Sequence, residues 1–224
     1  MVLAAGRGER MRPLTDTVPK PLLEAGGQPL IGYLLAALAR AGIRDIVINL
    51  SWLGERIRAA LGTGTEYGVR IAYSDEGPVA LDTGGGVHNA LPLLGADPFV
   101  VVSGDIWTDF DFGELRLDAA ADAQIVLAPN PPYHPRGDFG LEGGSVVERL
   151  PGAARFTYAN IGLYRPRLFN GCAPGRFPLV RLLEQVIAAG RLRGQVHCGE
   201  WLNIGTREQL AELDARLRRA APSV

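Results

Sequence analysis

The sequence has few cysteines, no long apolar segment and almost no net charge. Its 224 residues include only Cys172 and Cys198 as cysteines, which are too few for a disulfide framework and are not spaced as zinc ligands. No apolar run is long enough to span a membrane, and the first ten residues carry Arg7, Glu9 and Arg10 instead of a secretory signal. We therefore expect free thiols in a reducing, cytoplasmic compartment and no membrane association.

The charge balance predicts no polyanionic partner. The formal net charge is −1, so the chain as a whole attracts neither nucleic acid nor an acidic membrane surface. Aromatic residues make up 7% and are not interleaved with basic ones, which argues against a nucleic-acid-binding module. With 47% hydrophobic residues, the length suits one α/β domain with a full core. We expect a monomer, because the sequence contains no repeat or dimerising extension.

Apolar runs alternate with helical periodicity in the first half of the chain. The pattern predicts strands at 1–5, 43–50, 69–73 and 99–102, with helices at 29–42, 53–61 and 83–94 between them. This order indicates a doubly wound, mostly parallel α/β sheet. Beyond residue 120 the pattern predicts a strand at 123–128, a loop at 130–140, a hairpin at 141–150, a strand at 156–164, and helices at 179–189 and 206–217. The second half should therefore add antiparallel strands within a single domain, 1–224.

Two glycines and four cations follow the first strand. Gly6 and Gly8 free the backbone for positive φ and for close approach to a ligand, and their N–H groups can converge on an anion. The cations Arg7, Arg10, Arg12 and Lys20 lie within fifteen residues of them, which is the chemistry of a polyphosphate site. Met11 stands where a dinucleotide fingerprint needs glycine, and the P-loop spacing is absent. The alternative interpretation is a glycine turn with solvated arginines.

A carboxylate emerges at another strand end. Asp105 follows the apolar run 99–102, and ligands of open α/β sheets bind beyond the carboxyl ends of strands. Because Mg²⁺ is usually held by one or two carboxylates together with substrate phosphates, Asp105 is a candidate metal ligand. The alternative is an Asp that begins a turn. Asp109 and Asp111 are interpreted as caps of the following helical turn.

The longest motif has a known counterpart. The string Leu-Ala-Ala-Gly-x-Gly-x-Arg-Met-x-Pro-Leu-Thr from residue 3, with Pro-Lys-Pro-Leu at 19–22, resembles the signature of sugar-1-phosphate nucleotidyltransferases. The resemblance implies that a sugar-1-phosphate oxygen attacks the α-phosphorus of a nucleoside triphosphate with Mg²⁺ bound, and that pyrophosphate leaves. It also implies that 1–120 binds nucleotide and 121–224 binds sugar. Arg10 would bind pyrophosphate, Lys20 would bridge the α-phosphate and the sugar phosphate, and Asp105 would bind the metal.

Further positions take their roles from the same resemblance. Trp201-Leu202-Asn203-Ile204-Gly205-Thr206 is similar to a late family segment, which makes Asn203 the second metal ligand and leaves Thr206 as a helix cap. The nucleotide-binding residues implied are Ala4, Ala5, Gly6, Gly8, Leu81, Thr83, Gly84 and Gly85. The three glycines at 84–86 should bring backbone N–H and C=O groups close to the flat base. The sugar-binding residues implied are Gly137, Asp138, Glu148 and Asn160.

The choice of substrate also rests on the resemblance. The strings Leu-Asp-Thr-Gly-Gly-Gly and Gly-Asp-Ile-Trp-Thr-Asp, with the compact length, are most similar to family members that use UTP and N-acetylmuramate-1-phosphate in cell-wall recycling. The lactyl carboxylate of that sugar would need a cation, for which Arg136 and Arg165 are candidates. One alternative is a mannose-1-phosphate guanylyltransferase or an enzyme with another base. A different class, an inactive nucleotide-sugar sensor, would have no need for Arg10, Lys20 and Asp105 together.

Overall fold

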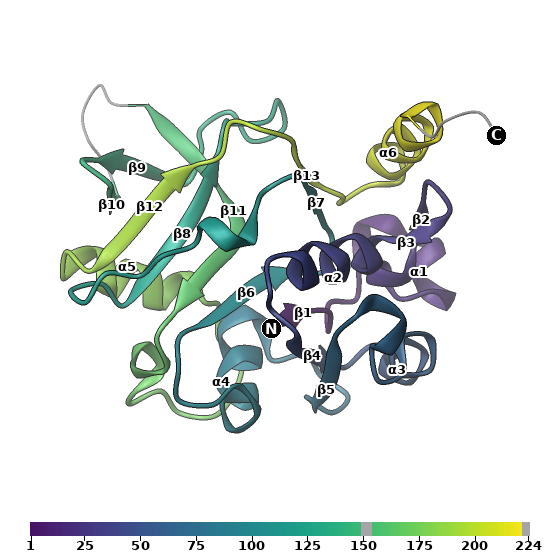
Figure 1. Ribbon diagram of the computed structural model, residues 1–224, viewed down its shortest axis with the longest axis horizontal. Coiled ribbons are helices and arrows are strands. Elements are labelled where there is room, and N and C mark those ends of the chain that lie inside the picture. The colour runs from purple at the N-terminus through teal and green to yellow at the C-terminus, as the bar shows by residue number, and fades with distance from the viewer. Residues whose placement is uncertain (149–153, 221–224) are drawn as a thin grey trace.

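A computed structural model describes residues 1–148 and 154–220 of the chain (Figure 1). Its strands are β1 Val2–Leu3, β2 Glu24–Ala25, β3 Gln28–Pro29, β4 Asp45–Leu50, β5 Arg70–Asp75, β6 Phe99–Ser103, β7 Ile106–Thr108, β8 Ala123–Ala128, β9 Phe139–Glu142, β10 Ser145–Val147, β11 Arg155–Tyr164, β12 Leu192–Val196 and β13 Trp201–Asn203. Its α-helices are α1 Leu14–Thr17, α2 Leu30–Arg40, α3 Gly54–Leu61, α4 Asp82–Leu94, α5 Val180–Ala188 and α6 Arg207–Ala220. No described helix is long and apolar enough to cross a bilayer.

One sheet runs through both halves, in the order β5-β4-β1-β6-β11-β8-β12-β10-β9. The first four strands are mutually parallel. The chain proceeds from β1 outward to β4 and β5, and then returns through α4 to β6 on the other side of β1. The strand order therefore reverses at β1, where the carboxyl ends of such a sheet form a ligand crevice. The prediction of a doubly wound sheet with antiparallel additions is confirmed.

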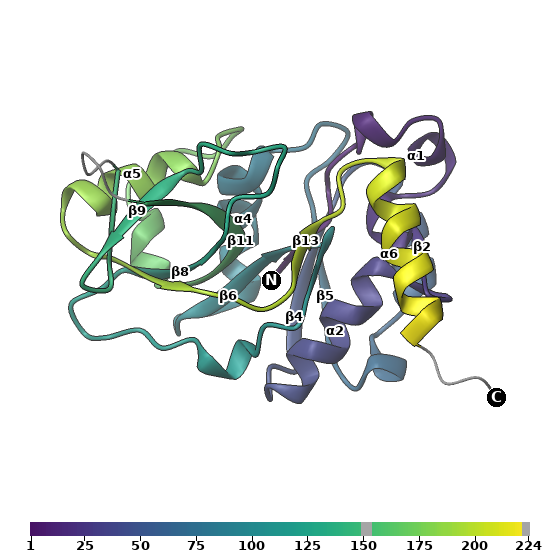
Figure 2. The same cartoon turned by 90° about the horizontal axis from the view of Figure 1, so that it is seen from above.

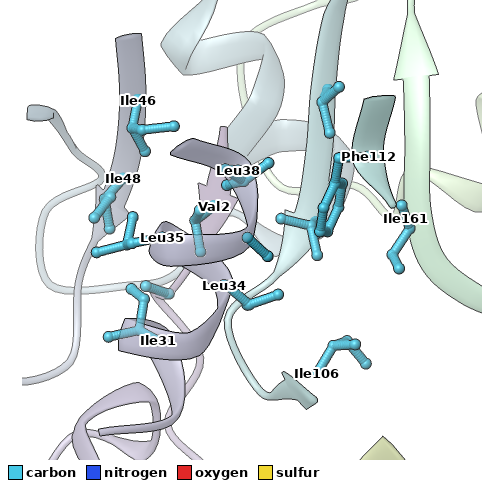
Figure 3. Packing of buried hydrophobic residues seen from close by; sticks show 14 of the residues in the cluster. Val2, Ile31, Leu34, Leu35, Leu38, Ile46, Ile48, Ile106, Phe112 and Ile161 are labelled. Atoms are coloured by element: carbon cyan, nitrogen blue, oxygen red, sulfur yellow. The ribbon is translucent and has the colours of Figure 1, made fainter. Parts of the chain in front are cut away.

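Alternate residues of the parallel strands face different helices. Ile46 and Ile48 of β4 pack in a cluster with Ile31, Leu34, Leu35 and Leu38 of α2, whereas Val47 packs on the other face with Val87 and Ala90 of α4. Figure 3 shows the first of these layers, with α2 lying over β1 and β4. The period of two in the strands and the i, i+3, i+4 spacing in α2 explain this division. Because both faces are buried, the strands read as continuous apolar runs.

The second half of the chain adds five strands with mixed directions to the sheet. β11 is antiparallel to β6 and β8, β12 is parallel to β8, and β9 pairs with both β10 and β11. The hairpin prediction at 141–150 is confirmed in part: β9 already begins at Phe139, inside the predicted loop 130–140, and 149–150 lie outside the described residues. β12 was not predicted, because Leu-Arg-Gly-Gln-Val has no alternating apolar pattern.

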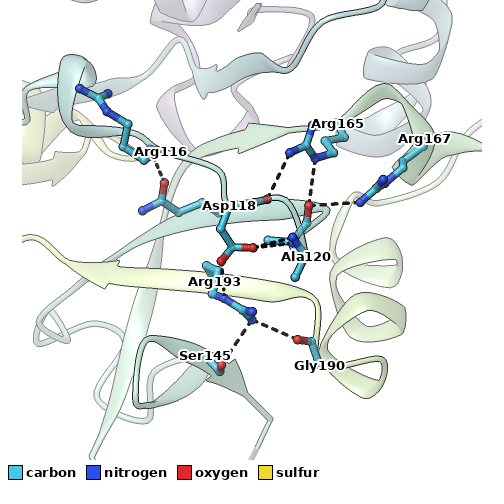
Figure 4. A network of polar contacts seen from close by, with 10 residues as sticks. Arg116, Asp118, Ala120, Ser145, Arg165, Arg167, Gly190 and Arg193 are labelled. Carbon is cyan, nitrogen blue, oxygen red and sulfur yellow. Dashed lines mark hydrogen bonds and ion pairs between the residues drawn. The ribbon is translucent and has the colours of Figure 1, made fainter.

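Polar contacts hold the loop before β8 to its neighbours (Figure 4). Asp118 accepts hydrogen bonds from the backbone of Ala120 and Ala121, at 2.9 and 2.8 Å, and from Arg193 Nε of β12 at 2.9 Å. Arg165, at the end of β11, donates to the carbonyl oxygens of Ala121 and Asp118. These bonds lie at the end of the sheet where β6 begins, because Tyr164, the last residue of β11, pairs with Phe99, the first residue of β6.

The C-terminal helix covers a separate, smaller cluster. Seen from above, α6 lies beside α1 and β2 (Figure 2), and Asp214 of α6 accepts a 2.8 Å hydrogen bond from the Gly26 N–H. Under it, Leu213 and Ile204 pack with Met11 and Leu30, all at most 1% exposed. Met11 directly follows Arg10, so this cluster packs the segment after the glycine turn against the C-terminal helix α6.

The core of α2 allows a direct test of this packing. Leu35→Ala should lower the free energy of unfolding by about 2–5 kcal/mol, because it leaves a cavity under a fully buried side chain. Leu93→Ala on α4, where the side chain is 50% exposed, is the matched control and should change it by less than about 0.5 kcal/mol. Urea unfolding of both variants measures the difference, and equal losses would contradict the burial.

Candidate active site

Two strand ends meet where the sheet order reverses. Leu3 of β1 pairs with Ser103 of β6, and the Gly104 N–H donates to the Leu3 carbonyl at 2.8 Å. A Cβ at Gly104 would lie 2.9 Å from that carbonyl oxygen, so only glycine permits this approach. The loop after β1 and Asp105 after β6 therefore start from adjacent points on the same edge, as the sequence predicted.

The two glycines of the first turn differ in their roles. Gly8 has a φ of 70°, and a Cβ there would lie 2.9 Å from Thr15 Cγ2, whose hydroxyl donates to the Gly8 carbonyl. Gly6 does not have positive φ, contrary to the prediction, and a Cβ on it would point into open space. Within the described residues, the N–H groups of Gly6, Arg7 and Gly8 have no hydrogen-bond acceptor in the protein. They are open to an anion.

The four cations also separate into two kinds. Arg7 lies 3.5 Å from the Trp52 ring centre and pairs with Asp16 at 3.0 Å, and Arg12 pairs with the same carboxylate at 2.9 Å. Arg10 is exposed and forms no ion pair with any described residue. A Cβ on Gly205 would lie 2.8 Å from its guanidinium. The turn thus presents one cation without a carboxylate partner.

Lys20 and Asp105 form an ion pair at the centre of the site. The Lys20 ammonium donates to Asp105 Oδ2, and the side chains are 12% and 23% exposed. The Asp105 carbonyl accepts a 3.0 Å hydrogen bond from Ile204 N–H, and Asn203 of β13 pairs with Ile106 of β7. Residues 20, 105 and 203, far apart in sequence, therefore occupy one region of the structure.

Two cavities share this pair. One of about 220 Å³ is lined by Ala4, Ala5, Gly6, Lys20, Asn49, Glu76, Asp82, Thr83 and Asp105, among others. The second, of about 270 Å³, is lined by Gly6, Gly8, Glu9, Arg10, Lys20, Asp105 and Gly205. The first is enclosed by strand ends and the start of α4, and the second by the glycine turn with its free arginine. Gly6, Lys20 and Asp105 lie at the boundary of both.

Sequence reasoning missed a hydrogen-bonded chain that walls the first cavity. The Ala4 N–H donates to Asn49 Oδ1 at 2.7 Å, Asn49 Nδ2 donates to Glu76 Oε1 at 2.6 Å, and the Leu81 N–H donates to Glu76 Oε2 at 2.6 Å. Burial raises the pKa of Glu76, although these two donors oppose the shift. The only sequence signal was Asn49 at the end of an apolar strand, where its side chain is buried.

The glycines Gly84 and Gly85 at the start of α4 pack against another segment of the protein. The N–H groups of Gly84 and Gly85 both donate to the Phe177 carbonyl, at 2.9 and 3.0 Å, so they are not free for a base. A Cβ on Gly85 would lie 2.2 Å from the Gly175 carbonyl oxygen. Leu81 likewise uses its N–H and its carbonyl within the protein. Close approach does require these glycines, but the approaching group is the segment 175–179.

The residues predicted for the sugar lie on and beside β9–β11. Both carboxylate oxygens of Asp138 are engaged, with His134 Nε2 at 3.0 Å and the Tyr158 N–H at 2.8 Å. Gly137 has a φ of 57°, and a Cβ on it would meet Asn130 Oδ1 at 2.6 Å. The remaining two, Asn160 and Glu148, make no side-chain hydrogen bond within the described part of the chain.

Asn160 is conformationally unusual. It has a φ of 55° at the irregularity where the β11–β8 register shifts. Asparagine tolerates this region better than other residues with a Cβ, yet the conformation costs about 1–3 kcal/mol. The Trp201 indole N–H donates to the preceding carbonyl, Ala159, at 2.9 Å. The bulge thereby holds an unpartnered amide next to the β13 segment.

Hydrogen bonds test several other interpretations made from the sequence. Asp111 caps its helical turn by accepting from the Gly113 N–H at 2.8 Å, whereas Asp109 does not cap it and instead accepts from the Glu200 N–H at 2.8 Å. Thr206 caps α6 with Gln209 in a reciprocal capping box. Arg165 is excluded as a partner for a sugar carboxylate, because it is bonded at the opposite edge of the sheet. Tyr133, also missed, lies near the site: partial burial raises its pKa, with Arg10 lowering it and Asp105 raising it.

The donor set fits a divalent ion that also binds phosphate. Among the described residues no three His, Cys, Asp or Glu side chains gather as a self-sufficient metal site. Asn203 Oδ1 is buried and has no hydrogen-bond partner in residues 1–148 and 154–220, which is costly unless a donor or cation completes it. Asp105 supplies the carboxylate. One carboxylate and one amide oxygen suit Mg²⁺, which keeps waters and takes further oxygens from phosphates.

A doubly wound sheet with open backbone amides and a cation at its switch point is the arrangement of a nucleotide-handling α/β enzyme. The chain belongs to the nucleotidyl transferase family, whose model matches residues 1–170. It is 48% identical to an N-acetylmuramate alpha-1-phosphate uridylyltransferase of Neisseria meningitidis, over 96% of each chain. A protein of the same description from Caulobacter vibrioides is 33% identical, over 98% of this chain and 97% of that one.

The fold has solved counterparts. A putative glucose-1-phosphate thymidylyltransferase from Bacillus anthracis, crystallised with a sucrose, superposes with a TM-score of 0.82 over 100% of this chain and 96% of that one. At 22% identity, this likeness establishes the shared fold.

The packing of the α4 glycines generates a stability test. Gly85→Ala should lower the free energy of unfolding by about 1–3 kcal/mol, because its Cβ would overlap the Gly175 carbonyl. Gly6→Ala makes the same chemical change where nothing lies within 4 Å, and should raise stability by up to about 1 kcal/mol. Thermal and urea unfolding compare the two, and a harmless Gly85→Ala would overturn the packing role.

Proposed function

We propose that this protein transfers the uridylyl group of UTP to N-acetylmuramate-1-phosphate, forming the UDP-sugar and pyrophosphate. The observation that carries the proposal is the meeting of the glycine turn, Lys20 and Asp105 at the switch point of the sheet, in a chain 48% identical to a protein of that description. Two relatives that match over at least 96% of both chains are described as uridylyltransferases of this sugar.

The nucleoside would occupy the cavity beside Asn49 and Glu76. Ala4, Ala5 and Gly6 line one wall of it, and Thr83 with Asp82 lines another. A uracil ring offers one N–H donor between two carbonyl acceptors. The carboxylate of Glu76, held by two donors, supplies an acceptor at this cavity. The sugar phosphate would enter from the side of Gly137, Asp138, Glu148 and Asn160, of which Asn160 has the free amide.

The triphosphate would lie in the second cavity. The N–H groups of Gly6 and Gly8, which have no acceptor among the described residues, would bind its terminal phosphates, and Arg10 would neutralise the leaving pyrophosphate. Lys20, between the two cavities, reaches the α-phosphate and the sugar phosphate. Holding two anions together in line supplies much of the catalysis, because it removes the entropic cost and the repulsion of their encounter.

The reaction needs no general base. A sugar-1-phosphate oxygen, already anionic, forms the new bond to the α-phosphorus. The bond from that phosphorus to the α,β-bridging oxygen breaks, and the electron pair leaves with pyrophosphate. When Mg²⁺ is bound, held by Asp105 and Asn203, it adds positive charge to the phosphates. The other tasks fall to the amides of the glycine turn and to Arg10 and Lys20.

The setting of this reaction is part of the proposal. A uridylyltransferase for a muramate sugar would act in cell-wall recycling, as a monomer in the cytoplasm. Both cysteines are free, in keeping with a reducing compartment. Light scattering tests the oligomeric state.

The substrate is tested by pyrophosphate release. UTP, GTP, CTP, ATP and dTTP are each offered with N-acetylmuramate-, N-acetylglucosamine-, glucose- and mannose-1-phosphate. We expect turnover with UTP and the muramate sugar. Best turnover with GTP and mannose-1-phosphate would instead identify a guanylyltransferase, and no turnover from folded protein with Mg²⁺ would favour a sensor.

Asp105 is tested by a conservative change. Asp105→Asn should lower kcat/KM by about 10²–10³-fold, since it removes the charge that would hold Mg²⁺ at the phosphates. Asp111→Asn, six residues further on, keeps its cap of the Phe112–Glu114 turn and should retain wild-type rates. Rates over a range of Mg²⁺ concentrations provide the comparison, and an active Asp105→Asn enzyme would remove Asp105 from the metal site.

A further inference from the structure

The proposed metal ligand already has a cation bound to it. Lys20 donates to Asp105 Oδ2, and at 12% and 23% exposure neither side chain is freely solvated. Asn203 Oδ1, buried and unpartnered, belongs to the strand that supports Asp105. In the absence of substrate, the carboxylate is therefore neutralised by the protein itself.

A metal ion and the ammonium compete for this position. A divalent ion on Asp105 would lie a few ångströms from the Lys20 ammonium. The single negative charge of the carboxylate would then face three positive charges, two on the metal and one on the lysine. Repulsion between these cations is strong at such distances, because a partly buried site screens charge less than water does. The triphosphate removes the conflict, because its oxygens accept both cations. Nucleotide and metal should consequently bind together, and each should bind weakly alone.

The identity of residue 20 fits such an exchange. Of the 23 lysine and arginine residues, Lys20 is the only lysine. Arginine would hold Asp105 through a planar, bidentate fork, whereas an ammonium is a compact charge on a flexible stem that forms bonds in several directions. A cation that must move between a carboxylate and a phosphate is better served by lysine.

We propose that Lys20 occupies the metal-binding carboxylate of Asp105 until a nucleotide arrives, and that the ammonium then transfers to the phosphates as Mg²⁺ takes its place. This inference rests on the proposed function, and concerns how the free enzyme is kept from binding metal on its own. Because coupling between two ligands is reciprocal, metal affinity rises with nucleotide bound, and nucleotide affinity rises with metal.

The exchange is tested by Mn²⁺ binding to the nucleotide-free protein, followed by the electron paramagnetic resonance signal of the free ion. Lys20→Met keeps an unbranched apolar stem and removes the charge, and should bind Mn²⁺ about tenfold more tightly than wild type, within the usual range of coupling. Lys20→Arg, the charge-preserving control, should bind no more tightly than wild type. Lys20→Met combined with Asp105→Asn should lose the gain.

A second measurement uses the unaltered protein. Selective ¹³Cε labelling of lysine gives a single side-chain resonance, because the chain has one lysine. This resonance should move when UTP and Mg²⁺ are added without sugar phosphate, as the ammonium leaves Asp105. An unmoved resonance at saturating UTP would overturn the transfer to phosphate.

The outcomes separate this inference from the proposed function. If pyrophosphate release requires Asp105 and Mg²⁺, but Lys20→Met binds Mn²⁺ no better than wild type, the competition is wrong and the reaction stands. If the wild-type protein releases no pyrophosphate with any of the nucleotides, the proposed function is wrong, whatever the Mn²⁺ measurement shows. A tenfold gain that disappears with Asp105→Asn supports the competition, and pyrophosphate release from UTP with the muramate sugar separately supports the proposed function.

Discussion

The structure depends on the parallel pairing of β1 with its two neighbours, β4 and β6. Only two residues of β1 belong to the sheet, yet Val2 pairs with Ile48 and Val102 at once. Parallel strands place their carboxyl ends on one edge, and the reversal of strand order at β1 opens that edge to a ligand. The glycine turn, Asn49 and Asp105 lie together for this reason, although up to a hundred residues separate them.

The charged side chains at that edge have two different roles. Arg7 and Arg12 are held by Asp16 and serve to shape the turn, which leaves Arg10 and the turn's amides facing the cavity. The end of the chain supports the same turn from outside, through Met11 in the cluster beneath α6 and Gly205 against Arg10. The C-terminal strap β13–α6 thus positions groups from the first and the middle parts of the sequence.

Much of the fold could be predicted because local patterns and burial agree. The unbroken run at 99–102 and the spacing of Leu30, Ile31, Leu34, Leu35 and Leu38 indicated a doubly covered sheet, and the structure has one. β7, β12 and β13 were missed, since short or polar strands are defined by their partners and not by their own sequence. Glu76 was missed for a similar reason, because its contact with Asn49 depends on the pairing of β5 with β4.

The sequence by itself determined the class of protein. The motif from Leu3 to Leu22 consists of residues that are close together in the chain, and Asp105 follows an apolar run that is also continuous in the chain. Only the tertiary structure decided which of those residues are free to act. It assigned Arg7 to Trp52 and Asp16, closed Gly84 and Gly85 against Phe177, and brought Lys20 onto Asp105. The physical reason is that hydrogen bonds and ion pairs are satisfied across space, and a residue's availability depends on what packs beside it.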